Sequence, residues 1–129
     1  MAPRTTQPPP APPNWSTEKT LSELRRRLDE LQQFKNRKYT QVKDQHSEWV
    51  DLAATVLRHG FGQDSLQVRD FYFTGHATGD YDIHFTPQAT KDQLNFEARV
   101  NWEERELKGR VRELELMLPE KEISGAYDA

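Results

Sequence analysis

LNFEARVNW, residues 94–102, is the stretch of sequence on which the fold depends. Apolar and polar residues alternate through it without exception, and this period of two is typical of a strand with one buried face. A helix that begins at Thr86-Pro87 and continues to Leu118 is the alternative, because proline is favourable at the first position of a helix. Such a helix would place apolar residues on both of its sides, so we expect a strand over residues 92–102.

Two segments that precede this stretch have a similar character. Residues 66–73 are rich in β-branched and aromatic side chains, and residues 81–85 alternate Tyr, Ile and Phe with Asp and His. Three half-buried strands in succession predict an antiparallel meander. A further helix is expected after Asn101, because leucine and valine recur at helical spacing as far as Leu118.

The segment from Trp15 to His59 contains neither glycine nor proline, which favours one uninterrupted helix. Ser16 is a suitable N-cap, and glycine follows His59. A helix of about 43 residues would span about 65 Å, which is more than the width of the remaining domain. The alternative is a break into two helices near residues 35–41, where the apolar spacing fails.

Leucines recur at heptad spacing near the start of this segment, and we expect them to form a short coiled-coil seam. Because the helix is predicted to project beyond the domain, this seam would be free to bind a partner helix or a second copy of the chain. The predicted partner-binding residues are Leu21, Leu24, Leu28 and Leu31.

The predicted order α–β–β–β–α, over roughly residues 47–118, resembles that of double-stranded RNA-binding domains. His76 falls in the turn where such domains reach a minor groove. The resemblance implies nucleic-acid binding as an alternative function. Those domains carry a lysine cluster at the start of the last helix, whereas the residues from Trp102 to Leu107 are mainly acidic and would repel phosphate.

The most site-like cluster of polar residues is Asp80, Asp82 and His84, which would share one strand face. Asp82 and His84 are weak candidates for a metal site, and a small metal-dependent hydrolase is the least favoured function. Alternate positions of an amphipathic strand are also polar simply because they face water. No catalytic motif, phosphate-binding loop or cofactor motif is recognisable, so we expect neither an enzyme nor a cofactor.

Composition is consistent with one small domain and flanking segments. Of the 129 residues only 34% are hydrophobic and 30% are charged, the net charge is −3, and there is no cysteine. No apolar run approaches the length of a membrane span, and we expect a cytoplasmic protein. The predicted organisation is α+β: a disordered proline-rich arm (residues 1–14), a projecting helix or coiled-coil segment (15–45), a small α+β domain (46–118) and a flexible acidic tail (119–129).

These features predict a non-enzymatic protein-protein interaction or assembly module. It would act through the helical seam and the small domain, with a protein partner or by self-association, and without a membrane.

Overall fold

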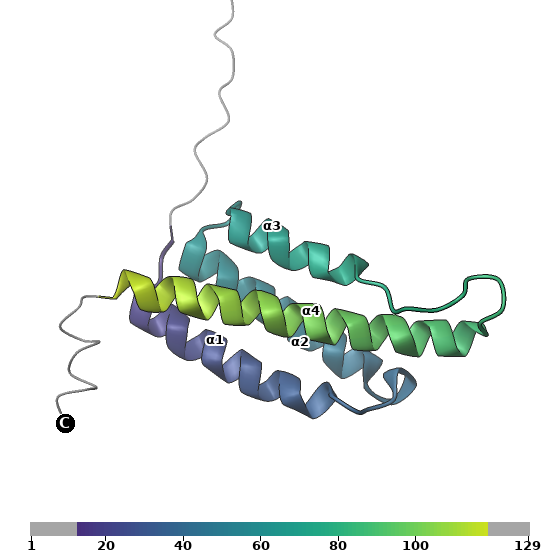
Figure 1. Cartoon of the computed structure of the whole chain (residues 1–129). Helices are drawn as coiled ribbons and strands as arrows, with labels where there is room; N and C mark the ends of the chain where they lie inside the picture. Colours follow the sequence, from purple (N-terminus) through teal and green to yellow (C-terminus); the bar gives the residue numbers. More distant parts are fainter. Residues whose placement is uncertain (1–12, 119–129) are drawn as a thin grey trace, which may run out of the picture.

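The computed structural model describes residues 13–118, and all regular secondary structure in this range is helical (Figure 1). The proline-rich arm as far as residue 12 and the predicted acidic tail lie outside the described residues. The elements are α1 (Thr17–Leu31), the 3-10 turn η1 (Gln32–Phe34), α2 (Tyr39–Phe61), α3 (Leu66–Phe73), the 3-10 turn η2 (Thr74–His76) and α4 (Gln88–Met117).

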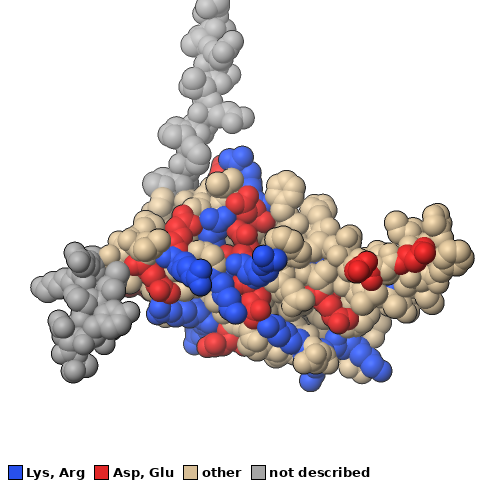
Figure 2. Space-filling model, viewed as in Figure 1, with Lys and Arg blue, Asp and Glu red and all other residues tan. Residues whose placement is uncertain are grey.

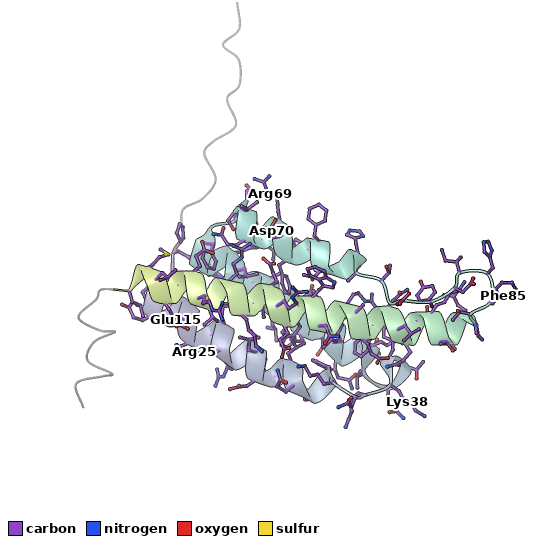
Figure 3. All side chains as sticks on the ribbon, viewed as in Figure 1. Arg25, Lys38, Arg69, Asp70, Phe85 and Glu115 are labelled. Carbon is purple, nitrogen blue, oxygen red and sulfur yellow. The ribbon has the colours of Figure 1, made fainter. Side chains whose placement is uncertain are left out.

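The four helices alternate in direction and form an elongated bundle (Figure 1). The backbone N–H of Asn14, just before α1, donates to the carbonyl oxygen of His59 at the end of α2 (3.0 Å), so α1 and α2 are antiparallel. Arg25 of α1 forms an ion pair with Glu115 near the end of α4 (3.5 Å), and Figure 3 shows the two side chains on adjacent helices. Gln67 near the start of α3 donates a hydrogen bond to Glu113 near the end of α4 (2.7 Å), so α3 and α4 are also antiparallel.

The α+β prediction is wrong, and residues 94–102 show why. They lie within α4, so the helix that begins after Pro87 is the observed alternative. The core positions of α4 have heptad spacing, but one of them is a glutamate. This glutamate interrupts the helical pattern, while the alternation of apolar and polar residues over 94–102 imitates a strand. The buried residues of α4 are Phe96, Val100, Glu103, Leu107 and Leu114.

The two other predicted strands are also absent from the described part of the chain. Residues 66–73 form α3, because Ser65 caps the helix by accepting a hydrogen bond from the backbone N–H of Val68 (3.3 Å). Val68 and Phe71 face the core at a spacing of three. Residues 81–85 lie in the irregular connection between η2 and α4. The order of elements of a double-stranded RNA-binding domain is therefore not present either.

The predicted long helix is interrupted where its apolar spacing fails. Lys35 and Lys38 are extended, and Asn36 has a positive φ of 61°, a conformation that asparagine tolerates better than most residues. The chain reverses here, so α1 packs along α2 and α4 of its own chain and does not project. The start of α1 approaches α2 closely: a Cβ atom added to Gly60 would lie 2.1 Å from Cγ2 of Thr20.

Candidate functional site

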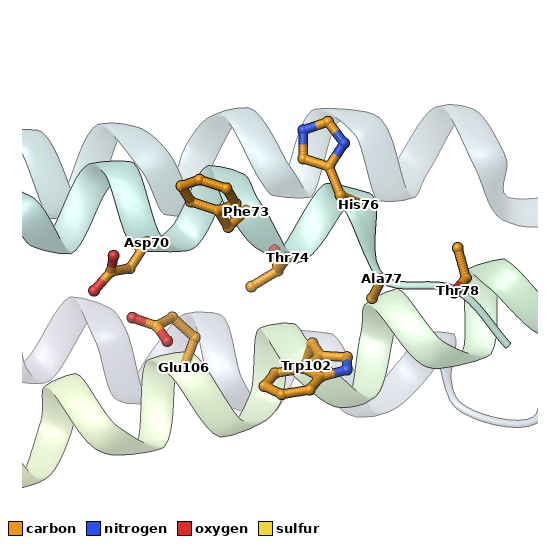
Figure 4. Close-up of a pocket in the computed structure, with 8 residues that line it drawn as sticks. All are labelled: Asp70, Phe73, Thr74, His76, Ala77, Thr78, Trp102 and Glu106. Atoms are coloured by element: carbon orange, nitrogen blue, oxygen red, sulfur yellow. The ribbon is translucent and has the colours of Figure 1, made fainter.

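A groove of about 530 Å³ separates α3 and η2 from α4 (Figure 4). Its position follows from the fold, because the short α3 covers only part of the longer α4 and ends at residue 73. The side chains that line it are Asp70, Phe73, Thr74, His76, Ala77, Thr78, Trp102 and Glu106.

Two large aromatic side chains form its apolar walls. Phe73 is 72% exposed and Trp102 is 49% exposed, although both lie on helices that pack against the core. Phe73 points away from the core because Phe71, two positions earlier, points into it. The guanidinium carbon of Arg105 lies 4.8 Å from the Trp102 ring centroid, a cation–π contact on the same helix.

Carboxylates dominate the end of the groove nearest to the start of α3. Asp70 and Glu106 face each other from α3 and α4 (Figure 4), and Nη2 of Arg110 lies 2.7 Å from a carboxylate oxygen of each. Arg110 also pairs with Glu113 at 3.0 Å. Although burial disfavours its charged form, hydrogen bonds and the charges of Glu113 and Glu106 raise the pKa of Arg110. The guanidinium of Arg110 thus forms ion pairs with three carboxylates, so this cluster has two more acidic groups than basic groups.

The other end of the groove leads to the connection between η2 and α4. Asp80 and Asp82 are exposed there, as are Ile83 (69%) and Phe85 (85%). Figure 3 places Phe85 at the tip of this connection, beyond the ends of the neighbouring helices. In Figure 2 the helical face carries mixed charges, whereas the projecting end carries only acidic and uncharged side chains in this view. The groove is therefore apolar in its middle and acidic at the end nearest to the start of α3, and Asp80 and Asp82 lie in the connection beyond its other end.

A second cleft, of about 270 Å³, lies over a buried pair of polar residues that joins α2 to α4. Nε2 of His46 is 2.7 Å from Oε1 of Glu103, and their side chains are only 8% and 2% exposed. Burial is the largest influence on Glu103 and raises its pKa, which the hydrogen bond and charge of His46 and the charge of Arg99 partly offset.

The surroundings of this pair favour a structural role over acid–base catalysis. The His46 ring packs edge-on against Phe34 and Phe96, with centroids 5.4 and 5.0 Å away, and lies parallel to Trp49 at 6.0 Å. Each member of the pair satisfies the other, so little of either remains available to a substrate. We therefore assign this pair to the core.

The predicted partner-binding leucines lie mainly inside the chain. Leu21, Leu24 and Leu31 are 4%, 0% and 0% exposed, and Leu28 is partly buried against the same core. Their heptad spacing reflects the contact of α1 with α2 and α4 of the same molecule. These leucines are thus covered by helices of the same chain, whereas the predicted partner-binding seam required them to be uncovered.

The candidate metal ligands Asp82 and His84 lie in the connection before α4. There Oδ1 of Asp82 accepts a hydrogen bond from the backbone N–H of His84 at 2.9 Å. Within residues 13–118 no group of three or more His, Asp or Glu side chains is arranged to hold a metal ion. The same range includes no helix both long and apolar enough to cross a bilayer.

Of the residues that line the groove, the sequence singles out only His76, as part of the resemblance to RNA-binding domains, and it predicts Trp102 on a buried strand face. One signal was available: Phe71, Tyr72 and Phe73 are consecutive, and on a helix three consecutive side chains cannot all face one core. Comparison of the chain with protein-family models, with curated proteins and with solved structures gives no match.

Proposed function

We propose that the chain is a non-enzymatic protein-interaction module, and that the groove between α3 and α4 binds an extended segment of a partner protein. The observation that carries the proposal is the pair of exposed aromatic walls, Phe73 and Trp102, in a concave site that is also lined by acidic side chains. Aromatic side chains bury a large area at little cost in side-chain entropy and are enriched where proteins bind one another.

The groove also indicates the chemistry of the segment. Proline-rich or otherwise apolar extended segments bind to grooves with aromatic walls, and their stiff backbone loses little entropy on binding. Asp70 and Glu106 at one end of the groove, and Asp80 and Asp82 in the connection beyond the other, favour a basic side chain next to the apolar part and disfavour a nucleic-acid backbone. A site of this size contacts only a few residues, so a weak and rapidly exchanging complex is expected.

The proposal also includes the cellular compartment. A cytoplasmic protein agrees with a chain that has no cysteine and thus gains nothing from an oxidising compartment.

The test uses the indole N–H resonances of the three tryptophans in the full-length protein. Trp102 lines the groove, whereas Trp49 is 3% exposed and serves as an internal reference. A short synthetic peptide of prolines and leucines with one arginine is expected to shift the Trp102 resonance progressively and to leave Trp49 unchanged. The same peptide with glutamate in place of arginine should bind at least about tenfold more weakly, a difference of about 1.4 kcal/mol.

Two results would count against this function. One is an unchanged Trp102 resonance at millimolar concentrations of either peptide. The other is equal binding of the two peptides together with a shift of Trp49, which would indicate nonspecific contact with the core.

A further inference from the structure

We propose that the proline-rich segment of this same chain, residues 1–12, binds in the groove and must be displaced by a partner. This inference rests on the proposed function, because it names one occupant of the same site. It makes the chain a module that partly blocks its own binding surface.

The composition of the segment fits the groove. MAPRTTQPPPAP contains five prolines within twelve residues, three of them consecutive at Pro8-Pro9-Pro10, and Arg4 is its one charged side chain. Prolines supply the apolar, pre-extended backbone that a groove with aromatic walls accommodates. Arg4 supplies the single positive charge that an acidic rim attracts.

The structure fixes the point at which this segment joins the bundle. The backbone N–H groups of Asn14 and Trp15 both donate to the carbonyl oxygen of His59, at 3.0 and 3.1 Å. The side-chain oxygen of Asn14 lies 2.8 Å from Nδ1 of His59, and the Trp15 ring stacks on the His59 ring with centroids 4.7 Å apart. The chain is thus held against the end of α2, a few residues before α3 begins.

From this anchored point, the segment before Pro13 can extend along α3 and reach the groove. In Figure 1 the described chain begins at the end of the bundle where α3 starts. Phe73 is the last residue of α3, which is about 12 Å long, and five residues of polyproline II cover about 15 Å. Counting back from Pro13, that distance places Pro8 to Pro10 beside Phe73 and Trp102.

The same count places the charged residue at the far rim. Arg4 lies four residues, or about 12 Å, beyond Pro8. It therefore reaches the connection that carries the exposed carboxyl groups of Asp80 and Asp82. The consecutive prolines of the segment would thus lie along the aromatic walls, and Arg4 would lie beside the carboxylates beyond the far end of the groove.

A spin label tests this arrangement in the full-length protein. The chain has no cysteine, so Thr6→Cys provides a unique attachment site for a nitroxide. The label is expected to reduce the intensity of the Trp102 indole resonance to less than half and to affect Trp49 less. Replacing Pro8, Pro9 and Pro10 with serine in the labelled chain should restore most of the Trp102 intensity. Replacing Thr5 with serine is the matched control and should restore none.

Three outcomes would overturn the inference. In the first, Trp102 keeps its intensity beside the label. In the second, the triple serine variant is broadened as strongly as the parent. In the third, a spin-labelled chain broadens the Trp102 resonance of an isotope-enriched chain that carries no spin label. This result would show that the segment binds the groove of a second copy instead of its own.

The peptide titration separates this inference from the function on which it rests. If synthetic peptide shifts Trp102 equally well in the parent and the triple serine variant, the groove binds partners but its own segment does not occupy it. If the inference holds, the triple serine variant binds peptide at least about threefold more tightly than the parent. If peptide binds to neither protein, the proposed function itself fails.

Discussion

His46 and Glu103 occupy core positions of two different helices, and Nε2 of the first lies 2.7 Å from Oε1 of the second. Val42, Trp49 and Ala53 continue the buried stripe of α2 on either side of His46. Each helix thus carries a polar residue where its heptad pattern requires an apolar one. Each residue provides a hydrogen-bond partner for the other, so the bundle gains a specific contact between α2 and α4 at the cost of burying two polar groups.

Removing one member of this pair should therefore destabilise the protein more than removing both. Glu103→Ala leaves the His46 imidazole buried without a partner, and we expect a loss of about 3 kcal/mol in the free energy of unfolding. Replacing both residues with leucine restores two continuous apolar stripes and should recover most of this loss. Chemical denaturation measures the three proteins, with the exposed substitution Glu97→Ala as control. A double variant less stable than Glu103→Ala would contradict this account of the pair.

The raised pKa of Glu103 has a consequence for the dependence of stability on pH. The folded protein keeps the Glu103 proton at pH values where the unfolded chain, with a carboxyl pKa near 4.5, has released it. The stabilising contribution of this group is complete below that value and is lost as the pH rises through the raised pKa of the folded state. Glu103→Gln cannot titrate, so the unfolding free energy of this variant should fall less steeply above pH 4.5. Parallel pH profiles for the two proteins would show that burial does not perturb Glu103.

The place of the break in the first half of the chain could be predicted from the sequence, because residues 35–41 are polar and interrupt the heptad spacing. Choosing between one helix and two was not possible, since the energy that decides it comes from packing. Once the chain turns at Asn36, Leu24 and Leu31 are buried against α2 and α4. An isolated long helix would leave the same leucines in water.

Helix α4 could not be recognised from its own sequence, because a residue of another helix provides the partner that allows the glutamate in its apolar stripe to be buried. The stripe from Phe96 to Leu114 has a glutamate at its centre, and only His46, 57 residues earlier, makes this residue acceptable in the core. The groove escaped prediction for a similar reason. Asp70 and Glu106 are far apart in sequence, and they meet only because α3 lies against α4.

Leu24 distinguishes a core helix from a partner-binding seam. Its side chain is fully buried, so Leu24→Ala should lower the free energy of unfolding by about 2–5 kcal/mol. Sedimentation of the folded variant should equal that of the parent, because the lost contacts lie within one chain. Ser22→Ala, an exposed change on the same helix, is the control for helix propensity. A variant with parental stability and a smaller assembly would instead assign Leu24 to an interface between chains.

The groove aromatics are expected to behave in the opposite way. Phe73→Ala and Trp102→Ala remove side chains that are 72% and 49% exposed, so each should change the free energy of unfolding by less than about 1 kcal/mol. Each should nevertheless weaken binding of the arginine-containing peptide by at least about tenfold, because the aromatic walls supply most of the buried area. Titration calorimetry or the amide resonances of residues around the groove measure this loss.

Leu116→Ala is the matched control, because Leu116 also lies on α4 and is 83% exposed, yet it does not line the groove. If loss of Leu116 weakens peptide binding as much as loss of Trp102, the peptide recognises exposed apolar surface in general. If only Phe73 and Trp102 matter, and their effects are not additive, both rings contact the same part of the peptide. The second pattern is the one that a groove between α3 and α4 requires.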